Sequence, residues 1–195
     1  MNSNMTSAKI ALVGNYRRDH LGNLSDKLQA VLDFATMAHK GQLRKYTGDP
    51  YILHPIEVML MIKCVPHDEA MLAAALLHDT VEDTDVIIEE IRQQFGDDIA
   101  DLVDDLTDVS KPEDGNRAVR KAMDRNHSAK SSPRAQTIKI ADLIRNSRSI
   151  IEHDRGFAKT YMVEKLQLLG VLTDGNKQLT SIALQILADY FRDQA

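Results

Sequence analysis

Residues 76–84 read Leu-Leu-His-Asp-Thr-Val-Glu-Asp-Thr, and they place one imidazole and three carboxylates directly after the apolar run 71–77. Burial of the apolar run would put this polar cluster at the edge of a core. On a helix the side chains of His78 and Asp79 point about 100° apart. Glu82 and Asp83 follow them by four residues, so each pair shares one helical face. The stretch therefore predicts a metal site with further carboxylates beside it.

The composition favours a single helical domain. Hydrophobic residues make up 43% of the 195-residue chain, which is enough for a core, whereas aromatic residues make up only 5%. The net charge of −5 offers no basic surface for nucleic acid. We find no signal peptide and no apolar run as long as a membrane helix, so we expect a soluble, cytoplasmic protein. The single cysteine, Cys64, excludes an internal disulfide and is expected to be buried.

The spacing of apolar residues predicts an all-α fold without internal repeats. Ser25 or Asn23, Asp68, Thr84, and Ser131 or Ser132 are the expected N-caps of helices. We expect residues 1–23 to form an N-terminal extension and residues 24–195 to form one domain. The expected helices cover approximately residues 25–40, 55–63, 69–78, 85–95, 99–106, 117–126, 133–146, 155–172 and 177–192.

Two neighbouring ligands do not make a metal site, so the remaining ligands must come from elsewhere in the chain. The best candidates are His54, which precedes a proline, and Asp142, which lies in an otherwise apolar segment. A His-His-Asp-Asp set without thiolate suits Mn²⁺, Fe²⁺ or Zn²⁺ and leaves coordination positions open for water. A His-Asp pair alone is more often a surface group or an ion pair at a helix end. The metal interpretation therefore depends on His54 and Asp142 reaching the same point as His78 and Asp79.

These residues resemble a known family. His54, the His78-Asp79 pair and Asp142 together resemble the HD superfamily of metal-dependent phosphohydrolases. Four strings resemble the hydrolase domain of the RelA/SpoT alarmone enzymes, in particular the stand-alone small alarmone hydrolases of the metazoan SpoT homologue type. The strings are His-Lys-Gly-Gln-Leu-Arg-Lys at 39–45, Tyr-Ile-Leu-His-Pro at 51–55, residues 76–84, and Lys-Ile-Ala-Asp-Leu-Ile-Arg-Asn at 139–146. The resemblance extends from about residue 24 to residue 190.

The resemblance implies a single HD-domain helical fold. It also implies a Mn²⁺-dependent enzyme of the stringent response, which removes the 3′-pyrophosphate of ppGpp or pppGpp to give GDP or GTP. By position, the implied metal ligands are His54, His78, Asp79 and Asp142. Glu82 and Asp83 match the catalytic pair for water activation and proton transfer. The implied substrate-binding residues are Arg44 and Lys45 for the base, Asn146 for a polar contact to the substrate near the metal, and Tyr161 and Lys165 for the ribose and phosphates.

Two positions depart from the family. Leu43 and Leu143 stand where many members carry a basic residue, which removes positive charge near the expected pocket. The departures leave other phosphorylated nucleotides open as substrates, namely (p)ppApp, NADPH or a nucleoside monophosphate. A non-catalytic nucleotide-sensing module is a further alternative, although sensing alone would not require both Glu82 and Asp83. In each case the partner is a small nucleotide, with no nucleic acid and no membrane. The sequence does not indicate an oligomeric state.

Overall fold

The computed structural model describes residues 21–194, so most of the expected N-terminal extension lies outside the described residues. The predicted all-α class is confirmed: the described residues form no strand, and Leu43 and Pro50 make a single isolated bridge. The helices are α2 (Asp26–Ala38), α3 (Leu53–Ile62), α4 (Glu69–Leu77), α5 (Thr80–Asp83), α6 (Ile88–Phe95), α7 (Asp97–Leu106), the 3-10 turn η1 (Pro112–Asp114), α8 (Arg117–Ser128), α9 (Pro133–His153), α10 (Arg155–Leu169) and α11 (Lys177–Arg192).

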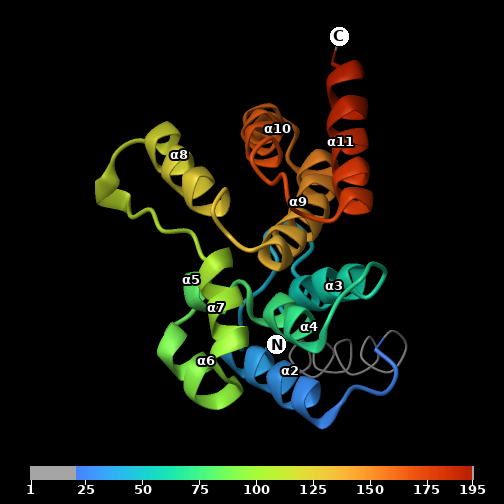
Figure 1. Ribbon diagram of the computed structural model, residues 1–195. Helices are drawn as coiled ribbons and strands as arrows, with labels where there is room; N and C mark the ends of the chain where they lie inside the picture. Colours follow the sequence, from blue (N-terminus) through green and yellow to red (C-terminus); the bar gives the residue numbers. More distant parts are fainter. Residues whose placement is uncertain (1–20, 195) are drawn as a thin grey trace, which may run out of the picture.

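The long helix α9 is the centre of the arrangement (Figure 1). Helices α10 and α11 pack against it on one side, and α3, α4 and α7 contact it on the other. Helix α8 follows the extended segment after α7 and contacts both α7 and α10. Segments far apart in the sequence therefore meet along α9. The division of the chain at residue 24 stays a prediction, although Leu21 is buried in the core.

Three of the expected helix starts are confirmed by their side-chain hydrogen bonds. The hydroxyl of Ser25 accepts a hydrogen bond from the Leu28 amide at 3.2 Å, and the carboxylate of Asp68 accepts one from the Met71 amide at 2.8 Å. Ser132 likewise caps α9, whose first residue is a proline. Such caps satisfy amide groups that have no partner inside the helix.

Two expectations were wrong. Thr84 does not begin a helix: its hydroxyl donates to the carbonyl of Thr80 at 2.7 Å and so closes α5, while α6 begins later with Ile87 as its N-cap. Cys64 is exposed instead of buried, because it follows the last turn of α3, and its thiol donates to the Leu60 carbonyl.

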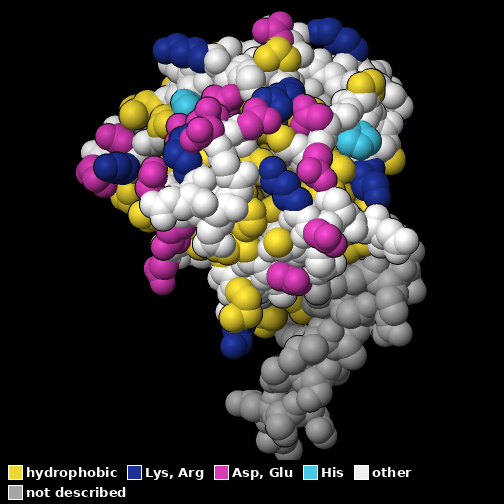
Figure 2. All heavy atoms as spheres, turned by 60° about the horizontal axis from the view of Figure 1, so that its bottom comes forward, with side chains coloured by type: hydrophobic (Ala, Val, Ile, Leu, Met, Phe, Trp, Pro, Cys, Tyr) yellow, Lys and Arg dark blue, Asp and Glu magenta, His cyan; other side chains and the backbone are white. Residues whose placement is uncertain are grey.

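The apolar run 71–77 is buried along its whole length, which anchors α4 in the core. The surface, by contrast, is mixed. On the face shown in Figure 2, basic side chains lie among acidic ones and neither sign forms a continuous patch. No helix among residues 21–194 combines the length and the apolar character needed to cross a membrane.

Candidate active site

The His-Asp pair lies at the joint between two helices. Helix α4 ends at Leu77 and α5 begins at Thr80, so His78 and Asp79 form the connection. The Thr80 hydroxyl donates to the Leu77 carbonyl at 2.6 Å and stabilises this joint. Because α4 is anchored by its buried side chains, the joint holds both functional side chains at the edge of the core.

The structure brings all four predicted metal ligands together. Ligand atoms of His54, His78 and Asp142 all lie within 4.8 Å of one another. Asp79 closes the group, because its Oδ2 lies 3.1 Å from His78 Nε2 and 3.6 Å from His54 Nε2. The shortest contact in the cluster, 3.0 Å between His54 Nε2 and Asp142 Oδ1, joins α3 to α9. Three separate parts of the chain thus meet at one point.

The orientation of His78 fits a metal ligand. Its Nδ1 lies 2.9 Å from the Ala75 carbonyl, a contact in which Nδ1–H donates, so the lone pair of Nε2 is free to face the cluster. Nε2 is buried and has no hydrogen-bond partner among the described residues. Nε2 faces two carboxylates and a second imidazole. Together these groups form a donor set that suits a divalent cation of borderline hardness, and such a cation would give the buried nitrogen a partner.

The electrostatics of the cluster show how the charges balance in the protein alone. Burial disfavours a charged His78, but Asp79 and Asp142 outweigh this effect and raise the pKa of His78 well above its usual value. Burial would likewise raise the pKa of Asp142, yet its hydrogen bond to His54 and the nearby His78 imidazole lower it well below its usual range. The protonated His78 imidazole therefore takes the place of a cation in the protein alone, which is the charge that a bound metal would supply.

Tyr51 is a residue of this site that the sequence analysis did not single out. Its hydroxyl donates to Asp79 Oδ2 at 2.6 Å. Burial, followed by the charge of Asp79, raises the pKa of Tyr51 far above its usual value, so the phenol keeps its proton and holds the carboxylate in place. The signal was present in the string 51–55, where Tyr51 precedes His54 by three residues.

The predicted catalytic pair separates in the structure. Glu82 lines a cavity beside Asp79, and its Oε1 accepts a hydrogen bond from the Asp108 amide at 2.7 Å. Loss of hydration against the cavity wall raises the pKa of Glu82 to about 7, even though the residue as a whole remains exposed. Asp83 faces Gln42 instead, whose amide donates to Asp83 Oδ2 at 3.2 Å. The side-chain oxygen of Gln42 in turn forms a hydrogen bond with His39 Nδ1, with 2.7 Å between the two atoms.

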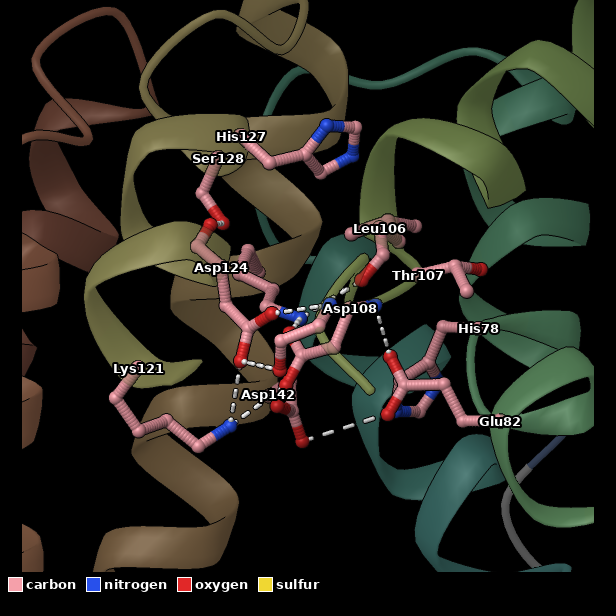
Figure 3. A network of polar contacts seen from close by, with 12 residues as sticks. His78, Glu82, Leu106, Thr107, Asp108, Lys121, Asp124, His127, Ser128 and Asp142 are labelled. Atoms are coloured by element: carbon pink, nitrogen blue, oxygen red, sulfur yellow. Dashed lines mark hydrogen bonds and ion pairs between the residues drawn. The ribbon is translucent and has the colours of Figure 1, made fainter. Parts of the chain in front are cut away.

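A charged cavity of about 180 Å³, here called the polar cavity, lies on one side of the cluster. Figure 3 shows part of the network of its wall, in which side chains from α5, from the segment after α7, from α8 and from α9 converge. The cavity reaches the His/Asp cluster at Asp79 and Asp142. Its other charged or polar lining residues are Glu82, Asp108, Lys121, Asp124, Arg125, Ser128, Lys139, Asn146, Glu164 and Lys165.

A second, mainly apolar cavity of about 300 Å³, here called the apolar cavity, lies on the other side. It reaches the cluster at His54, and Asn146 lines both cavities. The amide of Asn146 donates to Asp142 Oδ1 at 2.6 Å, one helical turn away. The other lining residues are Arg44, Lys45, Tyr46, Thr47, Tyr51, Ser149, Ile150 and Phe157. The structure thus gives one charged and one apolar compartment with a common boundary at the cluster.

Glu57 holds the basic loop of the apolar cavity in place. Its Oε2 lies 3.0 Å from Arg44 Nη1 and 2.6 Å from Arg145 Nη2. One carboxylate on α3 therefore fixes two guanidinium groups, one from the loop and one from α9. Lys45 is more exposed and pairs with Asp154 at 3.1 Å. The sequence analysis missed Glu57, since nothing local marks it as more than a helical surface residue.

The last two predicted substrate residues differ in position. Lys165 lines the polar cavity, whereas Tyr161 is buried beneath it and lines neither cavity. The Lys165 ammonium lies 4.9 Å from the centre of the Tyr161 ring, so the tyrosine supports the lysine from below.

The fold and the cluster define a class: an all-α domain in which two histidines and two aspartates from separate helices form a candidate metal centre. The sequence pattern of the HD domain family matches residues 31–168. This match covers more than half of the chain, and the chain belongs to the HD domain family.

Relatives narrow this assignment and bear out the resemblance to RelA/SpoT-type enzymes. The chain is 40% identical over 129 residues to the guanosine-3′,5′-bis(diphosphate) 3′-pyrophosphohydrolase MESH1 of Drosophila melanogaster, which covers 65% of the chain and 70% of that relative. It is 38% identical over 133 residues to human MESH1, with 67% and 73% covered. A solved structure described as a metazoan orthologue of SpoT that hydrolyses ppGpp superimposes with a TM-score of 0.78 at 32% identity, covering 86% of this chain and 97% of that one.

Longer bacterial relatives match only in part. The chain is 38% identical over 125 residues to the GTP pyrophosphokinase of Streptomyces coelicolor, and the match spans only 15% of that protein. A match to the guanosine-3′,5′-bis(diphosphate) 3′-pyrophosphohydrolase of Aquifex aeolicus, at 34% identity, spans 19% of it. The chain therefore corresponds to only a small part of these longer proteins.

Proposed function

We propose that this protein is a metal-dependent hydrolase that removes the 3′-pyrophosphate of ppGpp or pppGpp and releases GDP or GTP. The observation that carries the proposal is the position of the four-residue His/Asp cluster between a charged and an apolar cavity. The substrate has a matching division, since the base of guanosine tetraphosphate is largely apolar, its phosphate groups are charged, and the ribose joins the two. The names of the two MESH1 relatives support the same substrate.

The cluster is suited to hold a metal ion next to the phosphorus atom that water attacks. A divalent ion held by His54, His78, Asp79 and Asp142 would supply Lewis acidity, which makes water a better nucleophile and offsets charge on the attacked phosphoryl group. Phosphoryl transfer requires mainly positioning and charge stabilisation from the protein. Tyr51 meets part of this need because it fixes Asp79.

Glu82 is the proposed proton acceptor for the attacking water. It lies at the wall of the polar cavity beside Asp79, and a pKa of about 7 matches the pH at which a general base must work. Asp83, held by Gln42, is proposed to assist proton transfer to the departing ribose oxygen.

The apolar cavity is the proposed nucleoside site. Arg44 can stack on a purine because its guanidinium is planar, and Glu57 already holds it in place. Phe157 and Ile150 supply apolar contact, and Lys45 lies at the same wall. Asn146 lines both cavities and is proposed to contact the ribose end of the substrate.

Mn²⁺ is the proposed metal, with Fe²⁺ or Zn²⁺ as alternatives. The donor set of two imidazoles and two carboxylates contains no thiolate, so it suits any of these ions, and geometry alone does not separate them. Proteins loaded with each ion and compared at equal metal content would rank them.

The test of the proposed function is a substrate panel. Purified protein is incubated with ppGpp, ppApp, NADPH and GMP, each with Mn²⁺ and with a chelator, and the products are separated by anion-exchange chromatography. We expect GDP and pyrophosphate from ppGpp with Mn²⁺, and no reaction after chelation. Turnover that survives removal of the metal, or ppGpp that stays intact in every metal, would overturn the proposal.

A further inference from the structure

We infer that His39 is a positioning residue of the proposed hydrolase, because it acts through Gln42 to fix the direction of the Asp83 carboxylate. Neither His39 nor Gln42 lines one of the two cavities or belongs to the His/Asp cluster. The inference rests on the proposed function, in which Asp83 assists proton transfer to the departing ribose oxygen. It adds two residues that influence the reaction without touching the substrate.

His39 is a buried histidine that the proposed mechanism does not otherwise use. It directly follows α2, its amide donates to the Ala35 carbonyl at 3.0 Å, and the residue is only 3% exposed. Its ring packs against the ring of Tyr51, with 4.9 Å between the ring centroids. Because both the backbone and the ring are held, the imidazole has little freedom to rotate.

The side chain of Gln42 joins this ring to Asp83. Its oxygen lies 2.7 Å from His39 Nδ1, and its nitrogen donates to Asp83 Oδ2 at 3.2 Å. The backbone of Gln42 is held as well, since its amide donates to the His39 carbonyl at 3.1 Å and its carbonyl accepts from the Tyr51 amide at 3.0 Å. The end of α2 is thus connected to the end of α5 through one amide group.

The three side chains allow one consistent set of hydrogen bonds. An ionised Asp83 carboxylate only accepts, so Gln42 must present its nitrogen to Asp83 and its oxygen to His39. His39 Nδ1 must then carry a proton and donate. The other ring nitrogen agrees with this, because Nε2 is buried and has no partner among residues 21–194. A proton on Nε2 would be a buried donor without an acceptor.

The direction of Asp83 depends on this chain of hydrogen bonds. Asp83 is exposed, and within residues 21–194 its side chain has no hydrogen-bond partner other than Gln42. If the Gln42 amide were reversed, its oxygen would point at the carboxylate and repel it. His39 prevents the reversal, because a protonated Nδ1 cannot accept from the amide nitrogen.

The affected step is the departure of the ribose oxygen. Water gives up one proton and adds to phosphorus, the bond from phosphorus to O3′ breaks, and O3′ gains one proton. Proton transfer requires a group within hydrogen-bond reach of the accepting atom. A misdirected Asp83 would therefore lower kcat, whereas substrate binding in the two cavities would stay nearly the same.

The first test observes the His39 ring directly by NMR. Protein labelled with ¹⁵N in histidine and loaded with Zn²⁺, which is diamagnetic, is measured at about pH 8, where an ordinary imidazole is neutral. The His39 signals are assigned by their loss in His39→Leu. We expect the proton on Nδ1, and a mixture of both forms in Gln42→Met, which lacks the accepting oxygen. A native ring with its proton on Nε2 would overturn the inference.

The second test compares two substitutions of similar size. Asn at position 39 can place a donor near the position of Nδ1, whereas Leu has the same shape and cannot donate. We expect His39→Leu to lower kcat for ppGpp about ten-fold with KM changed by less than about two-fold, and His39→Asn to recover most of that loss. Equal losses would contradict the inference, since packing alone does not distinguish the two. Metal content is measured for each variant.

A double-mutant cycle connects the effect to Asp83. In an Asp83→Asn background, His39→Leu and Gln42→Met should each have little further effect on kcat, and a further ten-fold loss would overturn the inference. Gln93→Met is the control for Gln42→Met, because Gln93 is exposed on α6 and lines neither cavity. Failure of the proposed function would appear as ppGpp left intact by the native protein. The protonated nitrogen of His39 is observed without turnover, so the two failures are distinguishable.

Discussion

Glu57 holds Arg44 through an ion pair of 3.0 Å between Oε2 and Nη1, and the same oxygen also pairs with Arg145. The exposed fractions of the three side chains are 16%, 17% and 28%, so the group is largely shielded from water. A shielded pair keeps its geometry better than an exposed one. The orientation of Arg44 is thus set before any ligand arrives.

We predict that Glu57→Gln raises KM for ppGpp about ten-fold and leaves kcat almost unchanged, because the nucleoside contact loses its orientation while the cluster is intact. Charge alone would act in the opposite direction, since removal of an anion near a phosphorylated substrate should lower KM. Steady-state kinetics beside the exposed control Glu90→Gln separates the two effects. In an Arg44→Ala background the substitution should have little further effect, and full additivity would contradict the prediction.

We predict that Asp79→Asn and Asp142→Asn each lose most of the bound Mn²⁺ and of the turnover together. Asn keeps the shape of the side chain but removes the charge on which the metal depends. Metal content by mass spectrometry, beside activity at saturating Mn²⁺, checks this. If either variant retained a full equivalent of metal, its aspartate would not be a ligand.

We predict that the activity of the native protein rises with pH through about 7, because Glu82 must be ionised to accept a proton and loss of hydration at the cavity wall raises its pKa to about 7. Glu82→Gln should lower kcat by about 10²-fold and remove this acidic limb. The measurement is kcat/KM between pH 5.5 and 9 with Mn²⁺ in excess. A variant that kept the same pH profile would assign the limb to another group.

We predict that Asp108→Asn destabilises the fold in a way that depends on pH. Burial alone would raise the pKa of Asp108, but Lys139 and Lys121 outweigh it and lower the pKa to about 2. A lowered pKa stabilises the fold above the unfolded value near 3.8, and the effect is lost as the pH falls towards 2. The free energy of unfolding should therefore fall by about 2 kcal/mol at pH 7.

Urea unfolding at pH 7, 4 and 3 checks this prediction, with the exposed Asp104→Asn as the control. The gap between native and variant protein should narrow below pH 4. A gap that stayed constant over this range would mean that the charge of Asp108 does not matter for stability.

Much of the site could be predicted because its residues carry local signals. The buried run 71–77 fixes the position of His78 and Asp79, and the caps at Asp68 and Ser132 set the starts of α4 and α9. The convergence of His54 and Asp142 was predicted from residue type and from the resemblance. Their 3.0 Å contact, across 88 residues of sequence, agrees with that prediction.

The residues that were missed act through partners distant in the sequence. Glu57, Asp108 and Lys121 are ordinary surface types on or beside helices. Only the packing of α3 against α9, and of α8 against α7 and α10, gives them their ion-pair partners. Thr84 was misread for a local reason, since a threonine hydroxyl can serve the end of one helix as readily as the start of the next. Whether the Thr84 hydroxyl closes one helix or caps the next depends on the conformation of the neighbouring turn. The residue type alone does not specify that conformation.

Helix α9 carries Lys139 and Asp142 to the polar cavity, Asn146 to both cavities, and Ile150 to the apolar cavity. At about 1.5 Å per residue, a rigid rod about 16 Å long separates the first of these contacts from the last. The fixed spacing of these contacts along α9 would then select nucleotides by their length. A nucleotide that lacks one phosphate group could contact the residues at either end of this spacing, but not both.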